Sequence, residues 1–283
     1  MPPDHSADWL LVAEAHVRKL GDMAAAPDAA QRVVAMLSNP EASANDVADE
    51  LARDQVLSAK VLKLVNSGAS ALHSQIGTVS HAMVLLGFDV VRSLVLGASL
   101  FDKFNVTNKW LLEGLWNHSL GTAFLSGAIA VHMKLPNPEQ YAVSGLLHDI
   151  GQVAIARGFP AEAKKIHALV AARGGLMLKA EREVLGFTHG DAGVWLMHQW
   201  GLPSTLLSPI RDHHEFDASH AHAVRTAVVH VADILSRAKG IGNAGDILLP
   251  TLNPDAWRML GLTMGDLRKV LTLADAELAL PPP

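Results

Sequence analysis

Apolar residues recur at the spacing of a helix along almost the whole of this 283-residue chain. Runs of alternating β-branched residues bounded by turns, which are typical of strands, are absent from the sequence. The sequence therefore predicts an all-α fold. The hydrophobic content of 49% is sufficient for its core.

Start and stop signals divide the first half into short helices. Helical spacing begins at Ala44, and Asn66-Ser67-Gly68 provides a stop because glycine accepts the left-handed conformation of a helix end. Thr78 is a candidate cap for a short helix that Gly87 closes. A second group of helices is expected from about Lys109 onward.

The second group begins with a mostly apolar helix from Trp116 to Met133, with His118 near its start. The segment Asn137-Pro138-Glu139-Gln140 then combines an N-cap, a proline at the first helical position and a glutamine placed to complete a capping box. The helix that it opens is expected to run to His148-Asp149, where Gly151 interrupts it.

Three further helices carry histidine or aspartate. Thr188 is predicted to cap a helix that begins with His189, and Ser204 to cap one that reaches His213-His214. The last of the three spans roughly residues 221 to 238. The tail beyond it is rich in turns, and it regains a helical pattern at residues 256–260 and 264–278.

Composition excludes several kinds of site. The chain has no cysteine, which rules out disulfides, zinc–cysteine sites and thiol nucleophiles and favours a cytoplasmic location. The net charge is −5 and no block of lysine and arginine occurs, so nucleic acid is not an expected partner. No apolar stretch approaches the roughly 20 residues of a membrane-spanning helix, so no membrane association is expected.

Histidine is the unusual component, because the chain has 15 and seven of them lie between His189 and His230. Imidazole and carboxylate are good ligands for divalent first-row metals, and an aspartate can bridge two ions. The candidate metal ligands are His118, His148, Asp149, His189, His213, His214 and Asp233. Such a site would take one or two divalent ions, of Fe, Mn, Ni, Zn or Mg.

A structural role is the alternative for each histidine. An isolated histidine on a helix is usually a structural or surface residue, and we assign that role to five of them: His5, His16, His73, His132 and His167. The candidate ligands are scattered from His118 to Asp233 and lack the compact spacing of a zinc finger. Spacing alone leaves both interpretations open.

Several motifs resemble known families. The segment Gly145-Leu146-Leu147-His148-Asp149-Ile150-Gly151 resembles the HDIG motif of HD-domain metal-dependent phosphohydrolases. Two segments in the first half, 57–67 and 82–92, are similar to the N-terminal signatures of the HDOD family. Later landmarks of that family follow in order at 188–193, 200–203 and His213-His214. The resemblance covers roughly residues 25 to 237.

The resemblance implies a helical HDOD fold with an HD-like metal-binding core packed against an N-terminal helical subdomain. The expected division is an N-terminal HDOD-type subdomain at 1–108, an HD-like metal-binding subdomain at 109–239 and a helical tail at 240–283. Within the second part, His118 matches the first HD histidine and Asp233 the closing aspartate. The retained ligand set implies a divalent-metal site, and a binuclear one.

The resemblance also bears on activity. HDOD domains are regarded as non-catalytic signalling modules of bacteria, so a regulatory module is the preferred interpretation. The chain lacks the GYP residues after Glu215, has Gln152 where lysine often follows HDIG, and has Gly114 where relatives with a third metal carry glutamate. Cyclic di-GMP phosphodiesterase activity is therefore not expected.

The alternative function is a metal-dependent phosphohydrolase acting on a nucleotide or another phosphate ester, in which Asp149 would be the catalytic residue. The partner would be a signalling protein or a small phosphorylated ligand, and a homodimer is left open. Four basic residues lie near the ligands in sequence, although each is more often a solvated surface charge: Lys134, Arg182, Arg211 and Arg225.

Overall fold

The computed structural model describes residues 7–21, 28–37, 39, 41–53, 61–62, 78–86, 91, 95, 109–202 and 204–278. Every regular element within these ranges is a helix and none is a strand, so the predicted all-α fold is confirmed. In the described part of the chain, no helix is both long enough and apolar enough to cross a membrane.

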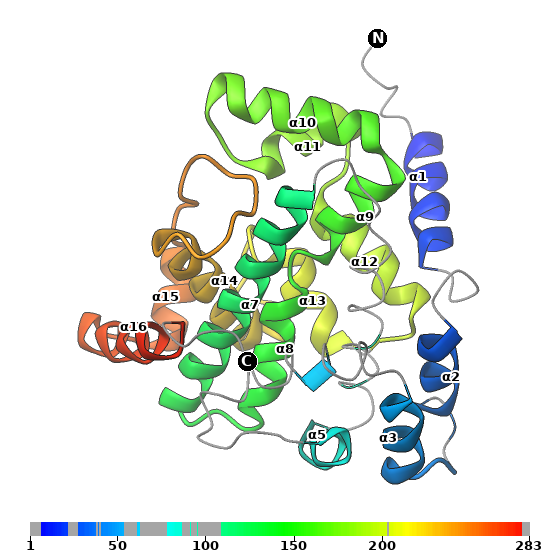
Figure 1. The fold of residues 1–283 in the computed structure, drawn as a ribbon. Helices are drawn as coiled ribbons and strands as arrows, with labels where there is room; N and C mark the ends of the chain where they lie inside the picture. The colour runs from blue at the N-terminus through cyan, green and yellow to red at the C-terminus, as the bar shows by residue number, and fades with distance from the viewer. Residues whose placement is uncertain are drawn as a thin grey trace.

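The helices are numbered in chain order (Figure 1). They are α1 (Ala7–Leu20), α2 (Asp28–Leu37), α3 (Ala44–Ala52), α5 (Val79–Leu86), α7 (Lys109–His132), α8 (Pro138–Leu147), α9 (Ile150–Gly158), α10 (Pro160–Arg173), α11 (Met177–Leu185), α12 (His189–Gln199), α13 (Ser204–Asp212), α14 (Ala223–Ala238), α15 (Pro254–Leu260) and α16 (Met264–Leu278).

Two of the predicted helix starts are confirmed by their hydrogen bonds. The Thr78 hydroxyl oxygen accepts from the amide of His81 at 3.2 Å, at the beginning of α5. Thr188 makes a capping box with Asp191, whose carboxylate accepts from the Thr188 amide at 2.8 Å. Each threonine hydroxyl accepts from a backbone amide in the first turn of its helix, as a side-chain cap does.

The predicted capping box at Asn137 is wrong. Asn137 has a left-handed backbone with φ 51° and makes no side-chain cap, and the Gln140 amide bonds instead to the Asn137 carbonyl oxygen at 3.0 Å. The predicted break at Gly151 is also misplaced. Gly151 lies inside α9. The junction between α8 and α9 comes before it, between His148 and Asp149.

Two other boundaries differ from the predictions. Helix α13 ends at Asp212, so His213 and His214 follow the helix rather than belong to it. Helix α7 begins at Lys109, which places His118 in its interior rather than near its start. The predicted stop at 66–68 and most of the signature at 57–67 lie outside the described residues.

Helix α7 runs through the middle of the molecule and packs against both α8 and α14 (Figure 1). One cluster of buried side chains joins the N-terminal helices to the later ones, since it includes Val33 and Val47 together with Leu147 and Leu196. A second cluster lies between α7, α14, α15 and α16. The division of the chain at residues 108 and 239 stays a prediction.

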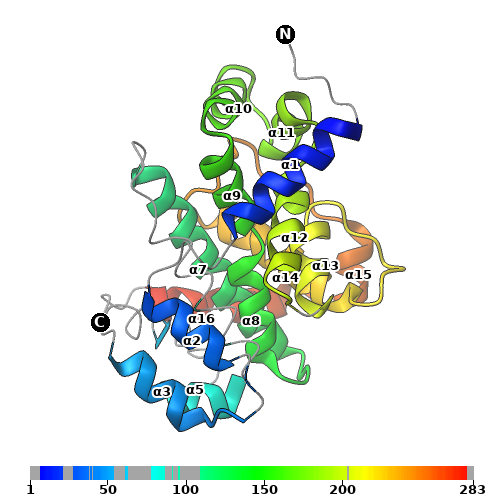
Figure 2. The same ribbon diagram turned by 90° about the vertical axis from the view of Figure 1, so that its right-hand side faces the viewer.

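Helix α1 lies across α9 and α12, which are far from it in the sequence (Figure 2). Two tryptophan indoles fasten it there. Trp9 Nε1 donates to the Leu185 carbonyl oxygen at 2.7 Å, and Trp200 Nε1 donates to that of Gly21 at 3.0 Å. The α9–α12 pair thus has a helix packed over its outer side.

Candidate metal centre

The seven candidate ligands come from five parts of the fold and meet in the interior. Six of them are buried, and the seventh, His214, has a side chain that is 10% exposed. They lie on α7, at the α8–α9 junction, at the first residue of α12, directly after α13 and on α14: His118, His148, Asp149, His189, His213, His214 and Asp233.

Close packing of α9 against α12 brings Asp149 and His189 together. A Cβ atom on Gly151 would lie 1.8 Å from the His189 carbonyl oxygen and 2.6 Å from the Gly193 amide nitrogen. Any side chain at residue 151 would therefore push the two helices apart. The glycine of the HDIG-like motif has a packing role here rather than a helix-ending one.

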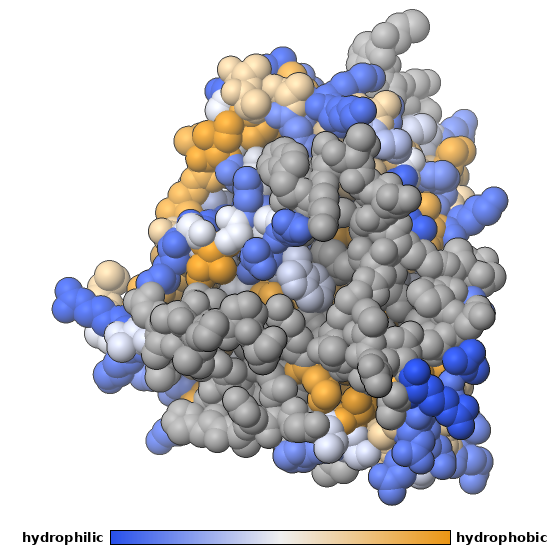
Figure 3. Space-filling model, viewed as in Figure 1, coloured by the Kyte–Doolittle hydropathy of each residue, from blue (hydrophilic) through white to orange (hydrophobic). Residues whose placement is uncertain are grey.

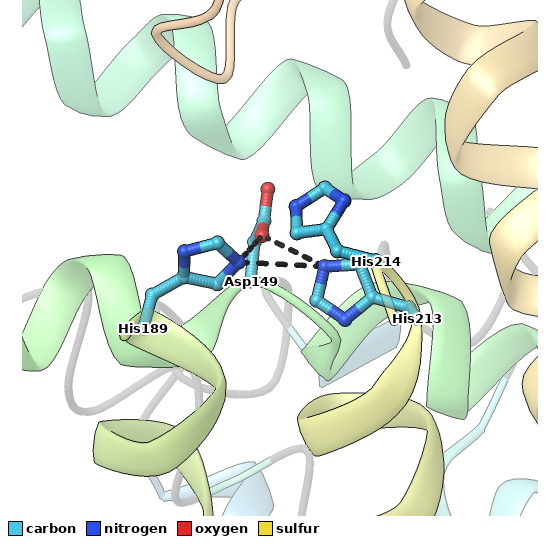
Figure 4. A group of neighbouring side chains, drawn as sticks. All are labelled: Asp149, His189, His213 and His214. Atoms are coloured by element: carbon cyan, nitrogen blue, oxygen red, sulfur yellow. Dashed lines mark hydrogen bonds and ion pairs between the residues drawn. The ribbon is translucent and has the colours of Figure 1, made fainter. Parts of the chain in front are cut away.

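Asp149 lies between two groups of histidines. Its Oδ1 is 3.3 Å from His189 Nε2 and 3.5 Å from His213 Nε2 (Figure 4). Its Oδ2 is 3.2 Å from His148 Nε2 and 3.7 Å from His118 Nε2. Each carboxylate oxygen therefore faces a different pair of imidazole nitrogens.

Asp233 completes the group that contains His118. Its Oδ1 is 2.9 Å from His118 Nε2 and 3.6 Å from His148 Nε2. Its Oδ2 is 4.0 Å from Nδ1 of His214, which also stacks its ring against that of His213 with 4.1 Å between centroids. All seven candidate ligands are thus brought to one place.

Backbone carbonyls fix two of the rings. His148 Nδ1 is 2.6 Å from the Gly145 carbonyl oxygen, and His213 Nδ1 is 2.9 Å from that of Pro209. Because a carbonyl oxygen only accepts, each Nδ1 must carry the hydrogen. In the neutral rings the Nε2 lone pairs then face the centre, which is the arrangement of metal-binding histidines.

Side chains hold two further rings, those of His189 and His118. His189 Nδ1 is 2.7 Å from Glu181 Oε2, which also accepts from the His189 backbone amide at 2.9 Å. His118 Nδ1 has a weaker partner, since it lies 3.4 Å from the Ser236 hydroxyl oxygen. These contacts again direct Nε2 toward Asp149.

When the rings are neutral, the imidazole nitrogens and carboxylate oxygens that face the centre are acceptors. Both oxygens of Asp149 and Oδ2 of Asp233 are buried, and none of the described residues gives them a hydrogen bond. Buried polar atoms are rarely left unsatisfied, and buried carboxylates are paired or bound to metal. The Nε2 lone pairs around them share the same need for a cation. The residues present therefore fit divalent metal.

Electrostatics within the cluster are strongly coupled. Burial opposes a charged ring at His148, but Asp149 and Asp233 outweigh it and raise the pKa of His148 to about 10. Burial opposes charge at His189 too, where Glu181 and Asp149 raise the pKa to about 9. At neutral pH these two rings bind a proton that a metal ion would have to displace.

Four residues beside the ligands were missed by the sequence analysis, and the first of these is Ser236, which contacts His118. Glu181 holds His189, and Arg237 Nε donates to Asp233 Oδ1 at 2.7 Å. Asp246, in the tail, makes an ion pair with Arg237. Arg237 lies one helical turn after Asp233, a spacing that could have revealed it, whereas no sequence signal points to Glu181 or Asp246.

The basic residues considered from sequence do not enter the centre. Arg182 pairs with Glu215, and Arg211 pairs with Asp212. Arg225 bonds to Gln140 and lies over the ring of Tyr141, and Lys134 is exposed.

Of the five histidines given a structural role, the three that the structure describes lie apart from it. His16 contacts the Gly158 carbonyl oxygen at 3.1 Å, and His132 pairs with Asp266 at 2.9 Å. His167 is partly buried beside α11, and neither group of potential ligands includes it. His5 and His73 lie outside the described residues.

Comparison with known proteins gives a family match and a matching structure. The family model of the HDOD domain matches residues 23–216. A crystal structure of an HDOD domain protein of unknown function from Geobacter sulfurreducens is 26% identical, with a TM-score of 0.64 over 95% of each chain.

Two curated relatives match over shorter parts of their own lengths. An uncharacterised protein from Treponema pallidum (strain Nichols) is 22% identical over 201 residues, which is 69% of this chain and 38% of that protein. Ribonuclease Y from Aquifex aeolicus (strain VF5) is 37% identical over 102 residues, which is 35% of this chain and 18% of that enzyme. The chain thus spans less than half of either relative.

Proposed function

Because the chain belongs to the HDOD domain family, we propose that it is a regulatory module of bacterial signal transduction with a binuclear divalent-metal centre. The observation that carries the binuclear assignment is the position of Asp149, whose two oxygens face two different pairs of imidazole nitrogens. A carboxylate placed in this way would be shared by two ions if both were bound.

Each ion would have its own protein ligands beside the shared Asp149. One ion would be held by His118, His148 and Asp233, and the other by His189, His213 and His214. Nitrogen and oxygen ligands of this kind suit zinc, iron, manganese or nickel, and availability would select among these ions. The ligands join α7, α9, α12 and α14, so metal binding would stabilise the fold as well as the site.

The alternative function is a metal-dependent phosphohydrolase. Two observations favour it, namely the complete set of converging ligands and the partial match to ribonuclease Y. Divalent ions, when bound, lower the pKa of a coordinated water and polarise a phosphoryl oxygen. In that case Asp149 would hold the ions at a fixed separation and orient the nucleophile.

Two measurements test these functions. Elemental analysis of protein purified without chelator should find about two ions per chain, and a value below about one would contradict the metal centre itself. A screen of nucleotides, phosphate esters and a short RNA with added manganese or iron then tests for hydrolysis. The regulatory function predicts none, whereas turnover that is lost in Asp149→Asn would establish the alternative.

A further inference from the structure

A loop of the tail crosses the rim of the metal centre. We call residues 240–249 the rim loop; it is the orange segment beside α7 in Figure 1. Its backbone is fastened to neighbouring elements by two hydrogen bonds, from the Asn243 amide to the Gly114 carbonyl oxygen at 2.8 Å and from the Ile247 amide to that of Gly175 at 3.2 Å. A third attachment is the Asp246 carboxylate, which accepts from the Met177 amide.

The rim loop sits directly on the turn of α7 that carries His118. Gly242 has φ +65°, and a Cβ atom there would lie 2.2 Å from the His118 amide nitrogen. A Cβ atom on Gly114 would in turn lie 3.1 Å from Cβ of Asn243. A larger side chain at residue 114 would displace the loop, so the glycine found there is explained by this contact.

Arg237 connects the rim loop to the ligands. Its Nε donates to Asp233 Oδ1, its Nη1 pairs with Asp246, and its Nη2 lies 3.6 Å from Asp149 Oδ2. Its side chain is only 8% exposed, and Nη2 has no hydrogen-bond partner among the described residues. Arg237 and His118 also line a cavity of about 250 Å³, whose outer wall is the rim loop.

A metal ion and Arg237 would draw on the same oxygens. An ion bound by Asp149 and Asp233 would coordinate Oδ2 of the first and Oδ1 of the second, which are the oxygens that face the guanidinium. The ion would also repel the guanidinium, since both are positive and the site is buried. Asp246, by contrast, has no place in the ligand set, so it would stay with Arg237.

We propose that Arg237 couples metal binding to the rim loop. When Asp149 and Asp233 coordinate metal, the guanidinium loses its contacts with both carboxylates. Arg237 then shifts outward together with Asp246, and the hydrogen bonds that fasten the rim loop weaken. The inference rests on the proposed metal centre, and it identifies release of the rim loop as the regulatory consequence of metal binding. The loop exposes Ile247, Leu248 and Leu249 by more than half, at the hydrophobic surface left of centre in Figure 3, so its release would alter an apolar surface.

Hydrogen–deuterium exchange of the full chain, with and without added zinc, tests the coupling. Peptides that cover the rim loop should exchange about 5-fold faster or more in the zinc-loaded protein, because coupling free energies between sites usually have this size or more. Metal content is measured on the same samples. Zinc that binds without accelerating exchange of the loop would overturn the coupling, whereas absence of bound zinc would overturn the proposed metal centre instead.

Two variants assign the coupling to the Arg237–Asp246 pair. In Arg237→Gln, exchange of the rim loop should no longer respond to zinc. Asp246→Asn keeps Arg237 in the core, so it tests the Arg237–Asp246 link even if the first variant folds poorly. In this second variant the rim loop should exchange fast with or without zinc. The matched controls are Arg258→Gln and Asp255→Asn, which break an exposed ion pair on α15 and should keep the wild-type response. A wild-type response in Asp246→Asn would contradict the proposal.

Discussion

The two halves of the metal centre are held by different kinds of contact. On what we call the Glu181 side, His189 is fixed by a buried carboxylate and His213 by a backbone carbonyl, both within 2.9 Å. On the Asp233 side, His148 is also fixed by a backbone carbonyl, at 2.6 Å, but Nδ1 of His118 has only a hydroxyl at 3.4 Å, and Asp233 is shared with Arg237. The difference therefore lies in two residues: His189 is held by a charged outer partner, whereas His118 is held weakly and its neighbour Asp233 is also bound by Arg237.

This difference suggests a division of roles. Pre-organised ligands with strong outer partners bind metal more tightly, because less is lost in ordering them. The Glu181 side would then hold a long-lived structural ion. The Asp233 side would hold the ion that exchanges, and it is the side that Arg237 links to the rim loop.

The largest effect is expected from Asp149→Asn, which removes the carboxylate shared by both sides. Loss of an outer partner alone costs 10- to 100-fold in metal affinity, so loss of the shared ligand should exceed about 100-fold for both ions. Calorimetric titration with zinc measures this, with the exposed Asp217→Asn as control. Retention of one ion at wild-type affinity would show that Asp149 does not join the two sides.

Gly151→Ala should displace the Glu181 side as a whole. The added methyl would clash with the His189 backbone, and overpacking of this kind costs about 3 kcal/mol of unfolding free energy. Urea denaturation measures the loss. Gly175→Ala is the control, since a Cβ atom there meets nothing within 4 Å. Equal stability of the two variants would contradict the packing role of Gly151.

Glu181→Gln should affect metal binding on the Glu181 side alone. It weakens the hold on His189 and should lower the affinity for one ion by about 10- to 100-fold while the other is unchanged. A two-site zinc isotherm resolves the two affinities. The control is Glu183→Gln on the same helix as Glu181. Glu183 is exposed and pairs with Arg173, so this variant should match wild type. A uniform loss at both sites would mean that the two sides are not independent.

The pH dependence of zinc binding should also differ between the sides. With a pKa of about 9 at His189 and about 10 at His148, each ion displaces one proton at neutral pH. Affinity should therefore rise by about tenfold per pH unit for each ion. It should level off near pH 9 on the Glu181 side and nearer pH 10 on the Asp233 side. Proton uptake on binding, or affinity independent of pH, would be the contrary result.

The smallest effect is expected from Ser236→Ala. A hydroxyl 3.4 Å from His118 Nδ1 makes a weak hydrogen bond, so its loss should reduce affinity on the Asp233 side by about twofold. The same titration detects this change, with Ser219→Ala on the surface as control. A loss as large as that of Glu181→Gln would remove the contrast between the two sides.

That seven side chains would belong to one candidate site could be predicted because the HDIG-like segment and the later landmarks occur in order along the chain. The outer residues could not. Glu181 and Asp246 reach the centre only because α11 and the rim loop fold back onto it, and no local pattern records such contacts. Helix caps show the same limit. Thr188 has the extended backbone, φ −111° and ψ 169°, that a cap requires, whereas Asn137 is left-handed after a tight turn and cannot cap.

The position of α1 bears on how the protein is made. Its two indole hydrogen bonds join residues 176 and 179 positions apart. A ribosome that adds about 5 to 20 residues per second needs roughly 10 to 35 s to supply those partners. During that interval the apolar side of α1, including Ala13 and Val17, has no native surface to cover it. The first described helix therefore cannot reach its native position until α12 has been made.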